Sequence, residues 1–278
     1  MNLNFNFAND IAKTSSDIWN KGWAERNAGN ISMRLSADNL QHIPKNNFNS
    51  SWRKLDIQVK NLMGEYFLIS GTGKYIRNIP VNPEENLGII EIDDIGERYR
   101  IVWGFANGGN PTSELSAHLV SHSVRKDVTN GVDRCIIHTH PTNLIALTYA
   151  LNLDTASITK LLWEMHAECI TVFPEGAEYL PWMMAGSKEI ADETAKAFLR
   201  RLLVIWEHHG VFASGSSLDV AFGIIDTAEK AAEIYIKAIS AGGIKKTLSI
   251  ENLVAIAHNF GFKPAQDIID QLSKIADL

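Results

Sequence analysis

Cysteine is scarce in this sequence of 278 residues. The two cysteines, Cys135 and Cys169, sit among apolar neighbours and show none of the paired spacings of a disulfide framework. A small secreted fold held together by disulfides is therefore excluded, and we expect both thiols to act as small buried apolar groups in a reducing compartment.

Long apolar runs and a surplus of basic residues are also missing. No run approaches the roughly 20 apolar residues that cross a bilayer, and the opening "MNLNFNFAND" lacks the basic start and apolar core of a secretory signal. The formal net charge of -6 and the pI near 5.8 leave no basic surface for nucleic acid or anionic lipid. We expect a cytoplasmic protein that binds neither nucleic acid nor membranes.

Several signatures of metal and cofactor sites are absent as well. There is no C-x-x-C pair for a structural zinc site and no H-E-x-x-H of a metalloprotease. The turn "GTGK" has Leu68 where a P-loop needs glycine, and Ile76 where a dinucleotide motif needs its third glycine. No lysine lies in a plainly apolar stretch, which disfavours a Schiff-base mechanism.

Strand and helix patterns alternate along the whole chain. Helices are expected over residues 10–26, from "PTSE" to Val124, and through most of 216–278. The segments "ISMRL", "YFLIS", "LGIIEI", "RIVWGF", "RCIIHTH", "CITVF" and "RLLVIWEHHGVFASG" read as strands. Because several strands follow one another directly, we predict a mixed, mainly antiparallel sheet between helical layers, a three-layer α/β fold. The chain is expected to form one domain over 1–278, with a surface excursion at 36–60.

Two histidines end one of these strands. On an extended strand, residues two apart point to the same face, so His138 and His140 could approach one metal ion. A second apolar run ends at His209, directly before a glycine. If both strands finish at the same edge of the sheet, three imidazoles with an open fourth position would form the site typical of catalytic zinc.

A competing cluster lies on one predicted helix. Glu114, His118 and His122 are spaced by four and share a helical face, so they could chelate a metal by themselves. We prefer to interpret both histidines as partly exposed helix residues, because no turn or glycine opens a pocket beside them.

The remaining candidates are carboxylates and anion-binding turns. Glu114, in the first turn of its helix, and Glu168, before the apolar "CITVF", are either acid–base groups or simple capping and surface charges. The glycines of "ISGTGK" could turn backbone N–H groups toward an anion, or form a plain turn. Asn27 and Asn30 of "RNAGN" could add amide donors, and Thr112 and Ser113 hydroxyl groups.

Five segments follow one another along the chain: "RNAGNISMR", "ISGTGK", "PTSELSAH", "IIHTHPTN" and "EHHGVFASG". Together they resemble the class II sugar-phosphate aldolases of the aldolase II and adducin superfamily. The resemblance runs nearly end to end and includes "KGWAERNAGN", "NLIALTYAL", "LLWE" and "FGIIDTAEKAA", which lie outside the metal motifs. Residues 36–60 and the last fifteen residues match poorly, and Thr72 stands where a serine is usual.

That resemblance implies a homotetramer with one Zn²⁺ in each subunit, held by His138, His140 and His209. It implies reversible aldol cleavage of a sugar phosphate to dihydroxyacetone phosphate and L-lactaldehyde, with Glu114 as the acid–base group. Glu168 matches a carboxylate that reaches the neighbouring subunit's site. The residues implied to hold the phosphate are Gly71, Thr72, Gly73, Thr112, Ser113, Asn27 and Asn30.

Three alternatives stay open. An L-fuculose-phosphate aldolase, a pentulose-phosphate 4-epimerase or a sugar-phosphate dehydratase would share the histidines and the phosphate turn. A non-catalytic, adducin-like binding module would be expected to lack some ligands, whereas the three histidines and Glu114 are all present. A purely structural metal protein would unfold when its metal is removed.

Overall fold

The structure, a computed structural model, describes residues 6–43 and 51–276. Its strands are arranged in a nine-stranded sheet in the order β2-β5-β4-β3-β1-β6-β9-β8-β7. The pair β7–β8 is parallel, whereas the pairs β1–β3, β1–β6, β2–β5, β3–β4, β4–β5 and β8–β9 are antiparallel. The predicted mixed, mainly antiparallel α/β fold is confirmed. The strands are β1 (Asn30–Arg34), β2 (Arg53–Lys54), β3 (Tyr66–Ser70), β4 (Leu87–Ile92), β5 (Arg98–Gly104), β6 (Cys135–Thr139), β7 (Ala177–Leu180), β8 (Leu203–Trp206) and β9 (Gly210–Gly215).

The described chain divides into two compact units. The first contains the residues up to His140 together with Met184–Leu199 and Ser214–Ala221. The second contains Pro141–Met183, Arg200–Ala213 and the residues from Phe222 onward. The expectation of a single domain over 1–278 stays a prediction.

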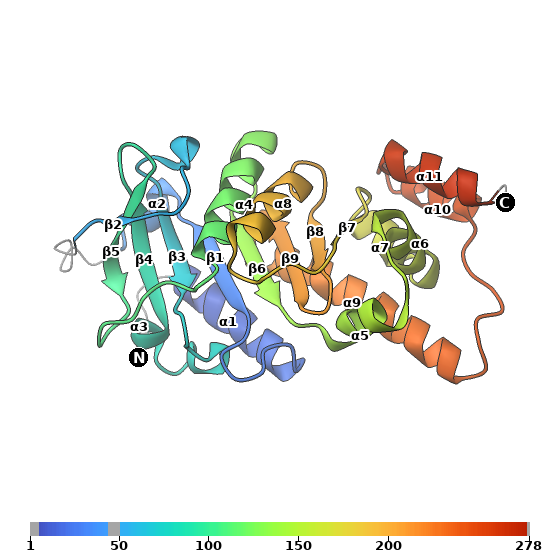
Figure 1. Ribbon diagram of the computed structural model, residues 1–278, viewed down its shortest axis with the longest axis horizontal. Helices are drawn as coiled ribbons and strands as arrows, with labels where there is room; N and C mark the ends of the chain where they lie inside the picture. Colours follow the sequence, from blue (N-terminus) through green and yellow to red (C-terminus); the bar gives the residue numbers. More distant parts are fainter. Residues whose placement is uncertain (1–5, 44–50, 277–278) are drawn as a thin grey trace. The chain divides into compact units, whose positions relative to one another are not determined.

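The first unit is built on strands whose side chains are buried on both faces. Figure 1 shows β5, β4, β3, β1 and β6 side by side in this order. The apolar side chains of Phe67, Ile69 and Ile90 pack with Leu115 and Leu119 from α4 into one core cluster. Helix α8 in turn packs against α4. The helices of this unit are α1 (Asn6–Asn20), α2 (Ala37–Leu40), α3 (Pro83–Asn86), α4 (Leu115–Val128) and α8 (Lys188–Ala197), with short 3₁₀ turns η2 (Lys60–Leu62) and η3 (Ile76–Asn78).

The segment expected to be a surface excursion contributes to this unit. Within 36–60, β2 forms the edge of the sheet and pairs with β5, and Leu55 and Val59 are buried in the core cluster. Residues 44–50 lie outside the described part of the chain.

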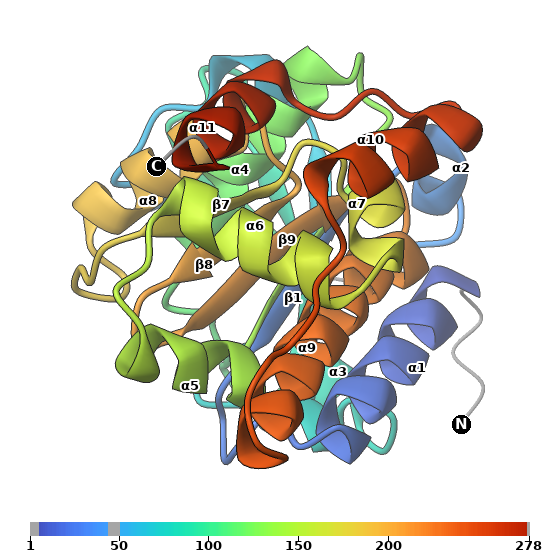
Figure 2. The same ribbon diagram turned by 90° about the vertical axis from the view of Figure 1, so that its right-hand side faces the viewer.

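In the second unit, helices cover the strands β7 and β8. Figure 2 shows α11 near α6 and α10 near α7, and both pairs are in contact. The helices are α5 (Thr142–Ala150), α6 (Thr155–Met165), α7 (Glu168–Val172), α9 (Leu218–Ser240), α10 (Ile250–Asn259) and α11 (Gln266–Ala276). α9 begins within the stretch that belongs to the first unit, and the rest of it belongs to the second. Within the described residues, no helix is both long and apolar enough to cross a bilayer.

Arg201 anchors the C-terminal helix in this unit. Its side chain is buried, donates to the backbone carbonyl of Glu175 at 2.5 Å and forms an ion pair with Asp267 of α11 at 2.5 Å.

Two expected elements differ from the structure. "CITVF" is not a strand, since Glu168–Val172 forms the helix α7. Cys169, Ile170 and Phe173 are buried, a spacing of one and four residues that fits one helical face and not the alternation of a strand. Helix α1 ends at Asn20 instead of continuing to residue 26, because Gly22 adopts a positive φ of 76° directly after it.

Candidate active site

The turn "RNAGN" brings the start of β1 to the histidine strand β6. Gly29 has φ +77°, and a Cβ atom there would lie 3.2 Å from the carbonyl oxygen of His138. Glycine is therefore needed for both the backbone conformation and the close approach. The next residue, Asn30, pairs with His138 in the antiparallel register of β1 and β6.

His138 lies in β6, and His140 directly follows its last residue, Thr139. Their ring centroids are 5.2 Å apart at an interplanar angle of 70°. The backbone N–H of His140 donates to the Trp23 carbonyl at 2.9 Å, and its Nδ1 lies 2.9 Å from a carboxylate oxygen of Glu25. A carboxylate on one ring nitrogen fixes the orientation of the imidazole and directs the other nitrogen toward a metal.

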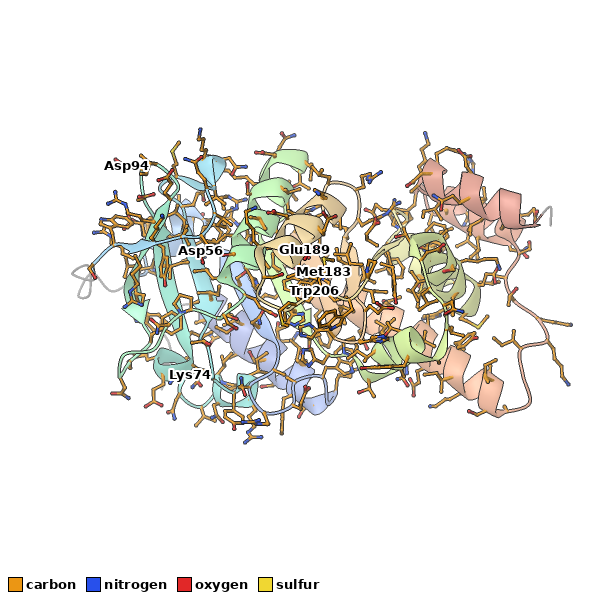
Figure 3. The ribbon with its side chains drawn as sticks, viewed as in Figure 1. Asp56, Lys74, Asp94, Met183, Glu189 and Trp206 are labelled. Atoms are coloured by element: carbon orange, nitrogen blue, oxygen red, sulfur yellow. The ribbon has the colours of Figure 1, made fainter. Side chains whose placement is uncertain are left out.

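His209 lies in the turn between β8 and β9, and this turn is held by side chains. His208, before it, adopts a left-handed φ of 59°, and its N–H donates to the Thr148 hydroxyl at 3.0 Å. The Tyr149 ring stacks on His208 at 4.0 Å. Trp206, labelled in Figure 3, has its ring 5.2 Å from that of His209.

The residue between Trp206 and His208 adds two further hydrogen bonds to this turn. Glu207 accepts from the Tyr179 hydroxyl and from the Trp182 backbone N–H, both at 2.8 Å. These hydrogen bonds hold the pKa of Glu207 below its usual range. An ionised Glu207 thus ties the His209 turn to β7 and to the segment that follows it.

The three predicted ligands form a donor set that could hold a metal ion. One ring nitrogen each from His138, His140 and His209 lies within 4.8 Å of the other two. Three imidazole ligands are a borderline-soft set that suits Zn²⁺ and its divalent neighbours and leaves coordination positions for a substrate.

Glu114 lies beside this donor set. It is the N-cap residue of α4 and not part of its first turn, and its side chain makes no capping hydrogen bond. Its Oε2 lies 3.5 Å from His138 Nε2 and accepts from the Asn30 amide at 2.7 Å. Burial raises the pKa of Glu114, and the Asn30 hydrogen bond and the charge of His140 partly oppose this rise.

His118 and His122 are not the partly exposed helix residues that we expected. Both are buried, with exposed fractions of 0% and 1%, because they face Ser32 of the neighbouring strand β1. Burial lowers the pKa of His118 to about 3 and that of His122 well below its usual range. Both imidazoles are therefore neutral at pH 7.

The glycine turn after β3 lies beside the start of α4. Gly71 forms an isolated bridge with Pro111, and the Thr112 N–H donates to the Ser70 carbonyl at 3.0 Å. The predicted phosphate residues of the two segments are thus brought together. Thr112 is buried, whereas Thr72, Gly73 and Ser113 are exposed.

Two backbone N–H groups of this turn already donate hydrogen bonds within the fold. The backbone N–H groups of Gly71 and Thr72 donate to the carbonyls of Asn86 and Asn110, at 2.8 and 2.9 Å. The groups that remain to face an anion are therefore the hydroxyls and the backbone at Gly73. Lys74, labelled in Figure 3, follows in the same turn, and the sequence reading gave it no role.

The remaining predicted site residues, Asn27, Asn30 and Glu168, differ in their exposure to solvent. Asn27 is exposed, whereas Asn30 is buried with its amide on Glu114 and its oxygen on His118. Glu168 is exposed at the first position of α7, so its carboxylate faces outward from the chain.

Comparison with known proteins identifies the family. The model of the class II aldolase and adducin N-terminal domain matches residues 9–236. The chain belongs to this family. The rhamnulose-1-phosphate aldolase of Mannheimia succiniciproducens is 46% identical over 269 residues, which cover 96% of this chain and 98% of that protein. The enzyme class expected from the motifs, a class II aldolase, is confirmed at this level.

Solved structures agree with the fold. A sugar-phosphate aldolase from Thermotoga maritima superposes with a TM-score of 0.72 at 29% identity, covering 86% of this chain and 97% of that one. An L-fuculose 1-phosphate aldolase superposes with a TM-score of 0.60 at 21% identity, covering 92% and 96% of the two chains. At that identity, the second likeness concerns the fold alone.

Sequence reasoning missed several residues that support the site. Glu25 and Glu207 carry no local pattern that marks them, because their partners come from distant segments. Ser32 could have been found, since it alternates with Asn30 on β1 just as His118 and His122 repeat on α4.

Proposed function

We propose that this protein is a zinc-dependent aldolase that reversibly cleaves L-rhamnulose 1-phosphate into dihydroxyacetone phosphate and L-lactaldehyde, in the catabolism of L-rhamnose. The end-to-end similarity to a rhamnulose-1-phosphate aldolase supports the substrate. The observation that carries the reaction type is a buried carboxylate, Glu114, beside one of three clustered imidazoles.

In this proposal, His138, His140 and His209 hold one Zn²⁺ in each subunit. When bound, the ion supplies a Lewis acid for the negative charge that develops on the ketone oxygen. Glu114 moves the proton at the carbon from which the aldehyde departs. A buried carboxylate beside the donor set can both accept and donate this proton.

The phosphate is proposed to bind at the paired segments after β3 and before α4. Thr72, Gly73, Thr112 and Ser113 offer hydroxyl and backbone donors there, and the adjacent Gly71 shapes the turn. Asn27 adds an exposed amide. Asn30, which we first expected to contact the phosphate, is better explained by its hydrogen bond to Glu114.

We further propose a cytoplasmic homotetramer in which Glu168 acts at the neighbouring subunit's site on the proton of the aldehyde oxygen. The exposed position of Glu168 at the start of α7 supports a role outside its own subunit. Light scattering of the purified protein should give four chains. A monomer that is fully active would contradict this arrangement.

The substrate is tested by incubating the purified protein with L-rhamnulose, L-fuculose and pentulose phosphates while measuring dihydroxyacetone phosphate. We expect L-rhamnulose 1-phosphate to be cleaved with the highest kcat/KM. Epimerisation of a pentulose phosphate without cleavage would favour the 4-epimerase alternative. Equal turnover of all substrates, or of none, would contradict the specific choice.

A further inference from the structure

Four polar side chains are buried between β1 and α4, next to Glu114. Asn30 and Ser32 are two residues apart on β1 and therefore point to the same face of the strand. His118 and His122 are four residues apart on α4 and share one helical face. Their exposed fractions range from 0% to 8%.

These side chains form a continuous series of hydrogen bonds that ends on Glu114. His122 Nε2 lies 2.8 Å from the Ser32 hydroxyl oxygen, which lies 2.6 Å from His118 Nδ1. His118 Nε2 contacts the Asn30 side-chain oxygen, and the Asn30 amide donates to Glu114 Oε2 at 2.7 Å. The series thus connects a buried imidazole on the second turn of α4 to the proposed acid–base group.

The chemistry of these groups determines which atom donates in each hydrogen bond of the series. An ionised Glu114 only accepts hydrogen bonds, so Asn30 must turn its NH₂ group toward it and its oxygen toward His118. His118 is neutral and has one N–H, which must then lie on Nε2, leaving Nδ1 to accept from Ser32. Ser32 in turn accepts from Nε2 of His122, so every donor points toward the carboxylate.

The far end of the series agrees with this direction. Within the described residues, His122 Nδ1 meets no hydrogen-bond partner. A buried nitrogen that lacks its proton costs less than a buried N–H without an acceptor, so the proton of His122 belongs on Nε2. The Phe67 ring packs 4.9 Å from the His122 ring, which leaves this end among apolar groups.

We infer that Ser32, His118 and His122 are positioning residues, which fix the Asn30 side-chain amide with its N–H toward Glu114 and thereby hold Glu114 in its reactive orientation. This inference rests on the proposed function of Glu114. Without the series, the Asn30 amide could rotate by half a turn and place its oxygen against the carboxylate, which would repel Glu114 from its position.

The critical variant is Ser32→Ala, because the Ser32 hydroxyl joins both histidines and lies outside the proposed substrate contacts. The matched control is Ser121→Ala. Ser121 is as buried as Ser32 and lies on α4, the helix that carries His118 and His122. Its hydroxyl donates to the local Ala117 carbonyl at 2.6 Å and takes no part in the series. Both variants remove one buried hydroxyl, and only the first interrupts the series.

The measurement is the exchange of the C3 hydrogen of dihydroxyacetone phosphate with deuterated water, which isolates proton transfer from cleavage. For Ser32→Ala we expect exchange and kcat to fall roughly 10–100-fold, with KM and zinc content nearly unchanged. Ser121→Ala should match the wild type. In a Glu114→Gln background, Ser32→Ala should lower the residual rate no further, because both changes act through one group.

Two results would overturn the inference. One is an equal loss of rate in Ser32→Ala and Ser121→Ala at equal thermal stability. The other is a Ser32→Ala effect of the same size with and without Glu114. Ser32→Thr, which keeps the hydroxyl, should restore the exchange rate, and its failure to do so while folded and zinc-loaded would count against the series.

A readout without substrate separates this inference from the proposed function. In a ¹H–¹⁵N spectrum of the protein labelled at histidine, His118 and His122 should appear as neutral Nε2–H tautomers from pH 5 to 8, and Ser32→Ala should shift the His118 signals. If these tautomers are seen but the wild type cleaves no sugar phosphate, the proposed function fails and the series stands. A protonated or Nδ1–H form of His118 refutes the series itself.

Discussion

At the scale of single residues, the site depends on how Glu114 is held. Its carboxylate is buried, faces His138 and accepts one hydrogen bond from the Asn30 amide. Burial raises its pKa, so the proton is bound more tightly than in water. The Asn30 amide and the His138 ring both meet the same carboxylate oxygen, Oε2.

The variant Glu114→Gln tests this role. The amide is similar in shape to the carboxyl group but cannot transfer a proton, so we expect kcat to fall by about 10²–10⁴-fold. Zinc content, measured by atomic absorption, and the affinity for a phosphate-bearing competitive inhibitor should be unchanged. Loss of zinc from the variant would instead identify Glu114 as a structural ligand.

The sequence predicted some contacts of this site and missed others, and the difference has physical reasons. The alternation in the sequence predicted that the side chains of His138 and His140 approach each other, because strand geometry is local, and their ring centroids lie 5.2 Å apart. The partner of Asn30 was missed, since an amide can bond to any nearby acceptor and the choice of Glu114 depends on the pairing of β1 with β6. His118 and His122 were misplaced for the same reason: their burial depends on β1.

At the scale of elements, the β4–β5 turn shows how one buried charge holds a hairpin. Asp93 accepts from the backbone N–H groups of Glu97 and Arg98, at 2.9 and 3.2 Å, and from the Arg98 side chain at 2.7 Å. Burial by itself would raise the pKa of Asp93, but these hydrogen bonds outweigh burial and the pKa is lowered. The folded state therefore favours the ionised form.

Asp93→Asn is expected to destabilise the protein by about 1 kcal/mol at pH 7, a value reduced because Arg98 is half exposed. The pKa is lower in the folded state, so the stabilisation is complete above the unfolded value near 3.8 and is lost as the pH falls through the folded value. Urea unfolding at pH 7 and below pH 4 should show the gap between the two proteins narrowing.

The matched control for this turn is Asp94→Asn, at the exposed neighbour labelled in Figure 3. We expect no measurable change in its unfolding midpoint at either pH. An equal loss of stability in both variants would mean that net charge, and not the hydrogen bonds of Asp93, accounts for the effect.

Elements were predicted best where periodicity was unambiguous. β3 (YFLIS) and β4 (LGIIEI) are short, mostly apolar segments of five and six residues, and both were found. "CITVF" was misread, because β-branched and aromatic residues favour a strand locally while packing selects the helix α7. A five-residue helix has too few turns for its period to be recognised in the sequence.

At the scale of the whole molecule, the apolar core cluster forms without the three histidines of the donor set. Phe67, Ile69 and Ile90 pack together with the helix α4 and do not involve the three histidines. His140 is further held by Glu25, and the turn of His209 by Thr148 and Glu207. The structure is therefore expected to persist when the metal is removed.

Dialysis against a chelator should abolish cleavage while the far-ultraviolet circular dichroism changes little, and added Zn²⁺ should restore activity. The reason is that a catalytic metal supplies chemistry, whereas a structural metal supplies folding energy. Unfolding of the chelated protein at room temperature would favour the structural-metal alternative.

The buried guanidinium of Arg201 has a consequence for how this chain can be shortened. Its ion-pair partner Asp267 lies on α11, beyond residue 236, where the match to the family model ends. A protein trimmed to the family boundary would retain the arginine and Glu178, 3.5 Å from its Nε, but would lose Asp267, its ion-pair partner at 2.5 Å. Expression designs guided by the boundary of the family alone would thus remove a tail that the interior of the protein requires, and the products would be prone to aggregate.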